Sequence, residues 1–112
     1  MGTRDEVLLG TLEQIVLLAV MQLGDDAYGG TIRDEIEERA GRVVSFGAVY
    51  VTLQRMEAKG LVTSRLGEPT AERGGRAKRF FLVTTEGRQA VRRVQDAVGA
   101  MAKGLKEARG TR

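Results

Sequence analysis

The chain has 112 residues, of which 18 are Lys or Arg and 15 are Asp or Glu, a net charge of +3, and no Cys or His. A chain of this length forms one small domain that buries about two thirds of the surface of its unfolded state. Without Cys or His, disulfides, thiol nucleophiles, imidazole bases and the usual zinc sites are excluded, so we expect neither a metal nor a cofactor. Because the net charge is small, attraction to a polyanion requires clustered cations.

The sequence contains no segment typical of a membrane protein. Its longest apolar run, from Ile15 to Met21, is far shorter than the ~20 residues that cross a bilayer. The beginning, MGTRDEV, lacks the charged and then apolar order of a signal peptide. We therefore expect a soluble, cytoplasmic protein that makes no membrane contact.

The first half of the chain predicts helices. The first lies in TLEQIVLLAVMQLG, where Thr11 as N-cap and Gln14 form a capping-box pattern and Gly24 ends an apolar segment. A second, short amphipathic helix lies in YGGTIRDEIEERAG and ends at Gly41. A third, in SFGAVYVTLQRMEAKG, begins at Ser45 and ends at Lys59. Its apolar face carries Phe46, Val49, Leu53 and Met56.

The hydrophobic period then changes. The segments LVTSRL and RFFLVT are rich in strand-forming residues and are separated by GEPTAERGGRAK, which holds the only proline. This pattern predicts a β-hairpin with a long tip. Thr84 or Thr85 then caps a last helix that is expected to run from about Glu86 towards Ala108.

An apolar stripe follows the last helix at spacings of three and four residues, which is typical of a coiled-coil seam. Gly99 and Gly104 each cost about 1 kcal/mol in a helix, so we expect the helix to need a partner. We expect that partner to be the same helix of a second copy, while packing against the first helix of its own domain is the alternative. The seam consists of Val91, Val94, Val98, Met101 and Leu105.

No group of residues indicates catalysis. The segment GDDAYGGT has the outline of a phosphate-binding loop, but Gly30 stands where the lysine is needed, and a helix rather than a strand precedes it. The paired acids lie at turns or on a polar helix face, where solvated charge explains them. We therefore expect no enzyme.

Three helices followed by a hairpin is the order of a winged helix-turn-helix. In this fold the third helix enters the DNA major groove, and the hairpin, or wing, lies along the backbone. We expect a mainly helical α+β fold, with a DNA-binding domain in residues 1–84 and a dimerisation helix in residues 85–112.

The outward face of the third helix combines small residues with one cation, as expected for a helix that approaches base edges. An ordinary solvated face is the alternative, but it would not explain an outward Val51. At the hairpin tip, Lys and Arg outnumber the acids Glu68 and Glu72, as expected for contacts to phosphates. The helix residues are Ser45, Ala48, Val51, Thr52 and Arg55, and the cations are Arg65, Arg73, Arg76, Lys78 and Arg79.

The chain resembles the PadR family of bacterial transcriptional regulators, in its short form. The resemblance rests on Tyr28, Gly29 and Ile32, on GAVYVTLQRMEAKGL from residue 47 to 61, and on GRAKRFFLVTTEGR. It implies that Tyr50 and its neighbours contact DNA, that residues Gly75 to Arg79 form the wing, and that the C-terminal helix dimerises. Tyr50 is alternatively a core ring with its hydroxyl at the surface.

This sequence departs from the family pattern at four positions. Ala48 replaces a threonine, Val51 replaces a proline, and Phe80 with Phe81 replaces a pair that contains tyrosine. These changes leave the expected fold intact but affect the expected base preference.

The resemblance implies a homodimeric repressor that binds a roughly palindromic operator and is released by a small effector, often a phenolic or other aromatic compound in this family. The identity of the effector is not indicated by the sequence. The alternative is a winged-helix module that binds another protein and no DNA.

Overall fold

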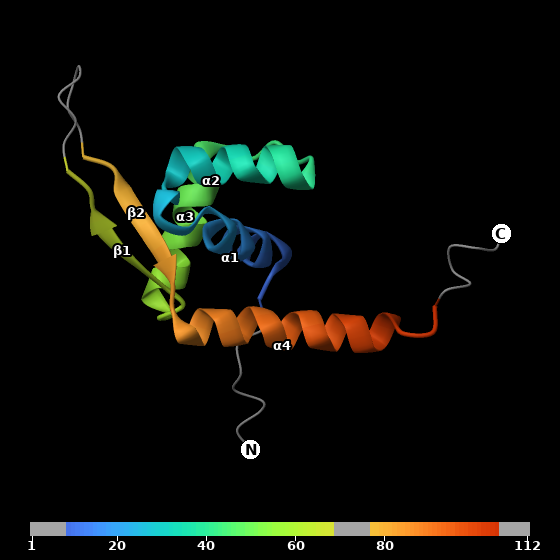
Figure 1. Cartoon of the computed structure of the whole chain (residues 1–112). Coiled ribbons are helices and arrows are strands. Elements are labelled where there is room, and N and C mark those ends of the chain that lie inside the picture. The colour runs from blue at the N-terminus through green and yellow to red at the C-terminus, as the bar shows by residue number, and fades with distance from the viewer. Residues whose placement is uncertain (1–8, 69–76, 106–112) are drawn as a thin grey trace.

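The computed structural model describes residues 9–68 and 77–105, which form a helical domain with one antiparallel hairpin (Figure 1). The predicted order of three helices, two strands and a last helix is confirmed. No helix in these two ranges is long and apolar enough to cross a membrane. The elements are α1 (Thr11–Leu23), a 3-10 turn (Gly24–Asp26), α2 (Gly29–Glu35), a π turn (Ile36–Ala40), α3 (Phe46–Ala58), β1 (Val62–Leu66), β2 (Arg79–Val83) and α4 (Thr85–Ala102).

The start of α1 differs from the prediction by one residue. Gly10, not Thr11, is the N-cap, and its N–H donates to the Glu13 carboxylate at 3.0 Å. Gln14 instead donates its amide to the carbonyl of Leu9 at 3.1 Å. A carboxylate is the stronger acceptor for an N–H at the positive end of a helix, which explains why Glu13 takes this role.

The start of α3 and the end of the second helical segment follow the predicted signals. The Ser45 hydroxyl accepts from the Ala48 N–H at 3.0 Å and caps α3. The π turn extends α2 to Gly41, which adopts a left-handed conformation with φ of 68°. Phe46 is the exception: it is 49% exposed, and its ring lies against Gly29 instead of in the core, because the first turn of α3 lies beside the start of α2.

The core lies where α1 packs against α2, α3, β2 and α4. Its side chains are aliphatic except for Phe81, the one aromatic ring among the fully buried residues of the described chain. Burying each large side chain contributes about 1.5–3 kcal/mol, so this cluster holds the helices together. The fully buried members include Leu17, Ile32, Leu53, Met56 and Phe81.

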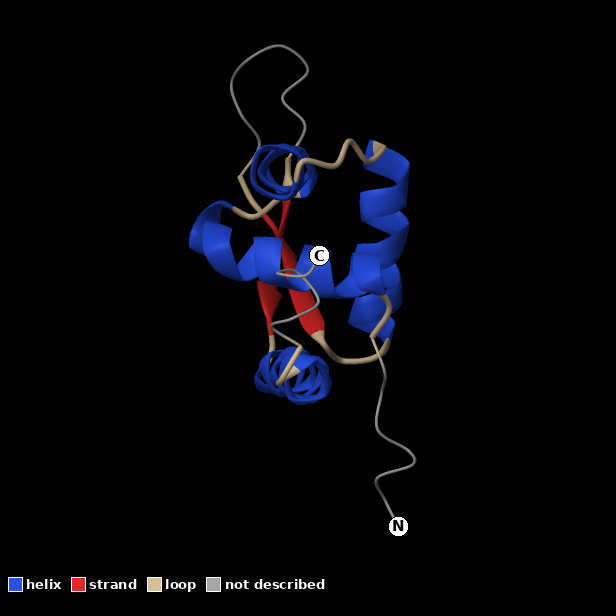
Figure 2. Ribbon diagram, turned by 90° about the vertical axis from the view of Figure 1, so that its right-hand side faces the viewer, coloured by secondary structure: helices blue, strands red, loops and turns tan. Residues whose placement is uncertain are grey.

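The hairpin pairs Val62 with Val83 and Arg65 with Phe80 in an antiparallel register. Successive side chains of a strand alternate between faces, so the hairpin has a core face with Phe81 and an outer face with Phe80. Tyr28 extends the sheet by a single bridge to Phe80. In Figure 2 the two strands lie between an upper and a lower helix, and both of these helices are viewed almost along their axes.

The last helix, α4, leaves the domain and projects away from it (Figure 1). Thr84 caps it, because its hydroxyl oxygen accepts from the Gly87 N–H at 3.0 Å. The helix ends at Ala102, and Gly104 has a φ of 91°. The predicted continuation through Leu105 is therefore wrong, because a residue with that φ does not continue a right-handed helix. Residues 106–108 lie outside the described ranges.

Candidate nucleic-acid interface

The outward face of α3 is formed by small and uncharged residues. Val51 is 52% exposed, Gly47 is exposed, and Ala48 is half-buried. Ser45 is exposed at the N-terminal end of the helix, although its hydroxyl is used as the cap. The small face expected from the sequence is therefore present, and a helix with such a face can approach base edges closely.

Gln54 is also exposed on this face, and the sequence reasoning missed it. It stands three residues after Val51, which places both on the same side of an α-helix. Its amide carries both donors and acceptors and can pair with a base edge, as glutamine does with adenine. The periodicity that identified Val51 was the signal that could have identified Gln54.

Thr52 does not lie on the outward face of α3, where we expected it. It is buried and only 4% exposed. It follows Val49 by three residues and precedes Leu53, both of which are fully buried, so the helical period turns it towards the core. Thr52 is therefore not available to DNA in this structure.

Arg55 has a partner that the sequence did not reveal. Its Nη1 lies 3.7 Å from Glu13 Oε2, and the Lys59 Nζ lies 3.4 Å from the same oxygen. Burial raises the pKa of the Glu13 carboxyl, but the hydrogen bond from Gly10 and the charges of Lys59 and Arg55 together hold that pKa below its ordinary value. Arg55 thus links the C-terminal half of α3 to the start of α1, and its DNA contact stays a prediction.

Tyr50 has a structural position on the side of α3 that faces the hairpin. Its ring stacks on Phe46 with centroids 6.2 Å apart and meets Phe81 edge-on at 6.4 Å. These distances are typical of favourable aromatic pairs. The ring is half-buried, which fits the alternative of a core ring, and its contact with DNA stays a prediction.

The described part of the wing carries exposed cations at its root, namely Arg65, Lys78 and Arg79. Arg79 Nη1 donates to Ser64 Oγ at 3.1 Å, and the Ser64 hydroxyl donates to the Glu57 carboxylate at 2.8 Å. This chain of bonds connects the hairpin to the last turn of α3. The predicted site residues Gly75 and Arg76, and also Arg73, lie outside the described residues.

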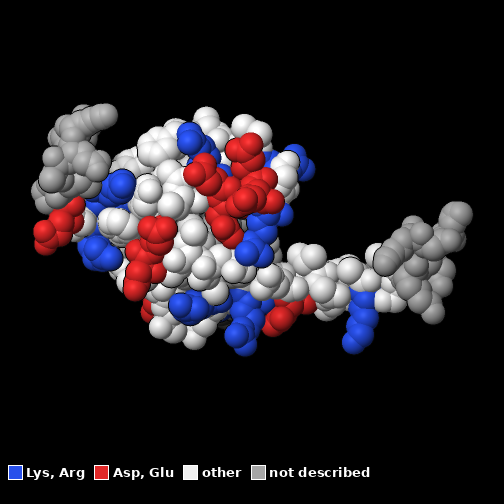
Figure 3. All heavy atoms as spheres, turned by 45° about the horizontal axis from the view of Figure 1, so that its top comes forward, with Lys and Arg blue, Asp and Glu red and all other residues white. Residues whose placement is uncertain are grey.

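Acidic side chains gather most densely over α2 and the π turn. Figure 3 shows this group with Lys and Arg at its edges, and further Lys and Arg beside the hairpin, where acidic side chains also lie. Within the acidic group, Arg39 pairs with Glu35. Asp34, Glu37 and Glu38 belong to that group. The exposed cations at the root of the hairpin, Arg65, Lys78 and Arg79, offer attraction to a polyanion.

The predicted seam of α4 is divided between two environments. Val91 is 2% exposed and belongs to the core of its own domain, so its assignment to a dimer interface is wrong; Val94 is half-buried and packs on that core. The distal side chains are exposed to solvent: Val98 is 60%, Met101 80% and Leu105 57% exposed. The alternative of packing on the own domain therefore holds for the first part of the stripe only.

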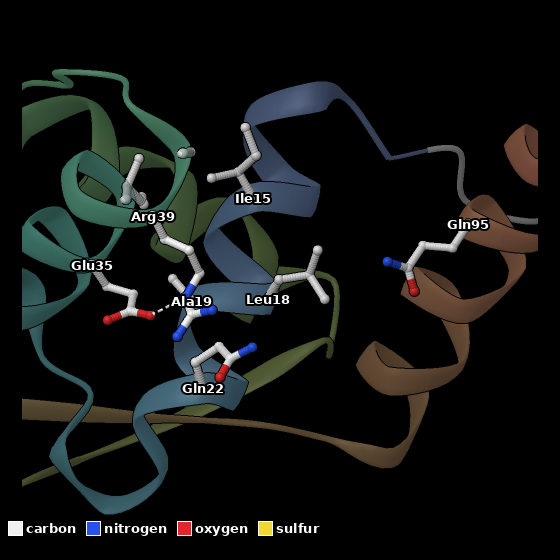
Figure 4. A pocket seen from close by; sticks show the side chains of 9 residues that line it. Ile15, Leu18, Ala19, Gln22, Glu35, Arg39 and Gln95 are labelled. Carbon is white, nitrogen blue, oxygen red and sulfur yellow. Dashed lines mark hydrogen bonds and ion pairs between the residues drawn. The ribbon is translucent and has the colours of Figure 1, made fainter.

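A cavity of about 310 Å³ lies between α1, the π turn and α4 (Figure 4). Ile15 and Leu18 of α1 form apolar walls, and Gln95 reaches towards the cavity from α4. At its edge, Arg39 Nε donates to the Glu35 carboxylate at 2.6 Å. This combination of apolar walls and few polar groups is typical of small-molecule sites.

Comparison with known proteins identifies a matching family and similar solved structures. The family model described as the transcriptional regulator PadR-like family matches residues 17–93. A PadR-like transcriptional regulator from Bacillus cereus is similar in structure, with a TM-score of 0.70 at 20% identity over 92% of this chain and 95% of its own. A PadR family regulator from Clostridium difficile gives 0.68 at 22% identity, over 88% and 98%. No curated protein sequence matches the chain.

A third structure, of Bacillus subtilis PadR in complex with operator DNA, has a TM-score of 0.62 at 19% identity over 79% of this chain and 46% of its own. These likenesses establish the winged-helix fold, in which the hairpin is the wing. Together with the family match over most of the described domain, they lead to one conclusion: the chain belongs to the PadR-like family of transcriptional regulators.

Proposed function

We propose that this protein is a homodimeric, sequence-specific DNA-binding repressor that acts in the cytoplasm. The observation that carries the proposal is the exposed face of α3 around Val51, on a helix whose last turn is bonded through Ser64 to Arg79 at the cationic root of the wing. Small residues admit the helix to the major groove, and the cations of the wing contact phosphates independently of sequence. The related PadR of Bacillus subtilis was solved with operator DNA, which supports the same role here.

The distal part of α4 supports the homodimer. Val98 and Met101 of α4, with Leu105 just beyond its end, line one apolar hollow. This distal part of α4 projects from the domain (Figure 1). A second copy offers the same stripe, so the two helices can bury it mutually in a two-fold interface. In such a dimer the two α3 helices reach successive major grooves about 34 Å apart, which predicts a roughly palindromic operator.

The cavity between α1 and α4 supports release by a small effector. A compound bound there would touch both the DNA-binding domain and the helix that we assign to the dimer, and so would link the two. The resemblance to the family favours phenolic or other aromatic compounds. A panel of such compounds should therefore include one that raises the melting temperature of the protein and releases bound DNA.

Binding to DNA that flanks its own gene tests the proposal, by electrophoretic shift and by selection from genomic fragments. Val51→Asp should abolish the specific shift, because it places a carboxylate against base edges. The pair Arg76→Ala and Lys78→Ala should weaken binding to all sequences alike and lower the salt slope by about 1.8, since each phosphate contact adds about 0.9.

Arg92→Ala provides a control, because Arg92 is an exposed cation on α4 and belongs to neither α3 nor the hairpin. Its binding should stay unchanged. If the wild-type protein shifts no DNA at moderate salt, the proposal is wrong, and the winged-helix module that binds a protein takes its place.

A further inference from the structure

Two cations and two aromatic rings form a row on the outer face of the hairpin. The guanidinium carbon of Arg65 lies 4.9 Å from the centroid of the Phe80 ring, and that ring meets Tyr28 edge-on at 5.4 Å. The Lys78 Nζ lies 4.6 Å from the centroid of the Tyr28 ring. All these distances are within the range of favourable cation–π and aromatic contacts. We call these four residues the wing brace.

The backbone holds the two rings in place. Tyr28 pairs with Phe80 in an antiparallel bridge, and the next residue of the strand, Phe81, donates its N–H to the carbonyl of Ala27 at 2.8 Å. The N–H of Tyr28 itself donates to the Thr31 hydroxyl at 3.0 Å. These bonds fix the Tyr28 backbone relative to β2, and none of them involves a cation.

Two glycines leave room for these rings. A Cβ atom at Gly67 would lie 2.7 Å from Phe80 Cε1, and one at Gly30 would lie 3.2 Å from Tyr28 Cε2. Neither glycine has a positive φ, so close approach of a ring explains them better than backbone geometry does. The Gly67 N–H also donates to the Lys78 carbonyl at 2.7 Å, which fixes the backbone that carries this lysine.

We propose that the wing brace orients Lys78 for a DNA phosphate, and that Tyr28 is a positioning residue of the DNA interface. The inference rests on the proposed function. A ring holds an ammonium group from one side only, so the remaining N–H donors of the exposed Lys78 stay free. A free lysine loses rotamer freedom when it contacts a phosphate, whereas a lysine already held on a ring loses less.

A purely structural role for Tyr28 predicts a different result. In that case its loss lowers the stability of the fold but acts on DNA binding independently of Lys78. The two roles are separated by a double-mutant cycle, in which coupled residues give effects that do not add.

The test measures fluorescence anisotropy of a mixed-sequence duplex of about 30 base pairs at several KCl concentrations. Tyr28→Leu should lower the affinity about three- to tenfold without changing the salt slope. Tyr28→Phe keeps the ring and should stay within about twofold of wild type. Lys78→Ala should lower the slope by about 0.9, and Tyr28→Leu should then have no further effect.

Leu82→Ala is the matched control, because Leu82 is exposed on the same strand face, two residues from Phe80. It should leave the affinity unchanged. If Tyr28→Leu lowers the affinity equally in the presence and in the absence of Lys78, the positioning role is wrong. It is also wrong if Tyr28→Phe binds as weakly as Tyr28→Leu. If the wild-type protein binds no duplex at all, the proposed function itself has failed, which is a different result from additive losses.

Proton NMR of the DNA-free protein tests the brace without relying on binding. The Lys78 Nζ lies over the Tyr28 ring. The neighbouring ε-methylene protons should therefore resonate upfield of their random-coil position, in wild type and in Tyr28→Phe. If the Lys78 ε-methylene protons of the wild-type protein resonate at their random-coil position, Lys78 does not pack on the Tyr28 ring and the wing brace is wrong. This result does not depend on whether Tyr28→Leu folds.

Discussion

The two halves of α4 carry one apolar repeat but meet different surroundings. In the first half, Gly87, Ala90 and Val91 are buried against the domain. In the second half, Val98 and Met101 are 60% and 80% exposed. The repeat indicates which side of the helix is apolar, but what covers that side depends on where the rest of the domain ends.

The glycines of α4 show the same division. A Cβ atom at Gly87 would lie 2.2 Å from the carbonyl oxygen of Leu61, whereas a Cβ at Gly99 would meet nothing within 4 Å. The first glycine permits close packing on the hairpin, and the second merely lowers helix propensity. Substitutions along α4 should therefore have opposite effects in its two halves.

The largest effect is expected for Gly87→Ala. The added methyl group would overlap the Leu61 carbonyl and approach Val83 Cγ1 at 2.7 Å, so the helix must shift from the hairpin. We expect the free energy of unfolding to fall by about 3 kcal/mol or more, measured by urea denaturation at fixed protein concentration. An unchanged midpoint would show that the first turn of α4 does not pack as closely as described.

Val98→Asp tests the exposed half. A charge in a buried seam is costly, so we expect the dissociation constant of the dimer to rise about a hundredfold, equivalent to about 2.7 kcal/mol, while the helical circular dichroism is kept. Analytical ultracentrifugation measures the change. Ala100→Asp, on the opposite side of the exposed segment, should leave the dimer intact. A Val98→Asp dimer as tight as wild type would refute the dimer seam.

We expect acid to lower the free energy of unfolding of the domain, against which the first half of α4 packs, because Glu13 becomes protonated. The folded-state pKa of Glu13 lies below its ordinary value of 4.5, so its ionised form stabilises the fold. That contribution is complete above pH 4.5 and is lost as the pH falls below this value and through the folded-state pKa. Glu13→Gln should therefore lose less stability than wild type on acidification, by about 1 kcal/mol, in urea denaturation at a series of pH values.

Glu37→Gln is the control for this experiment, because Glu37 is exposed. Its stability should follow the wild-type pH dependence. A Glu13→Gln variant that also follows the wild-type curve would show that the pairing with Arg55 and Lys59 does not stabilise the fold.

The smallest effect is expected for Gly99→Ala, which should raise the free energy of unfolding by up to about 1 kcal/mol because alanine is the better helix former. Gly104→Ala should not stabilise, since Gly104 has a φ of 91° that alanine adopts only with strain. Thermal unfolding of both variants, at one protein concentration, checks the pair. Equal stabilisation by both would indicate that α4 continues beyond Ala102.

The sequence predicted much of the fold, because its signals are local. Capping by Ser45, the stop at Gly24 and the change of period at the hairpin depend on neighbouring residues, and all three are confirmed. The cap of α1 was misplaced because Glu13, and not Gln14, accepts the bond from the N-cap N–H, while Gln14 donates its amide to the Leu9 carbonyl. The exposed Val51 was predicted correctly, since a helix period places it opposite Val49 and Leu53.

The candidate site was predicted less completely, because long-range contacts change the role of single residues. Thr52 lies at the border of two helix faces, and only the packing of α3 on its neighbours turns it inward. Arg55 meets Glu13 from another helix, and Lys78 meets Tyr28 across the sheet, pairs that are separated by tens of residues. Local patterns hold no information on such partners.

The sequence by itself determined the order of elements, the apolar stripe of α4 and the cations at the wing, because propensity, period and charge are properties of neighbouring residues. The tertiary structure alone decided that Val91 belongs to the core while Val98 stays exposed, and that Lys78 lies on Tyr28. Burial and pairing depend on where distant segments meet, and that is settled only when the helices and the hairpin pack together.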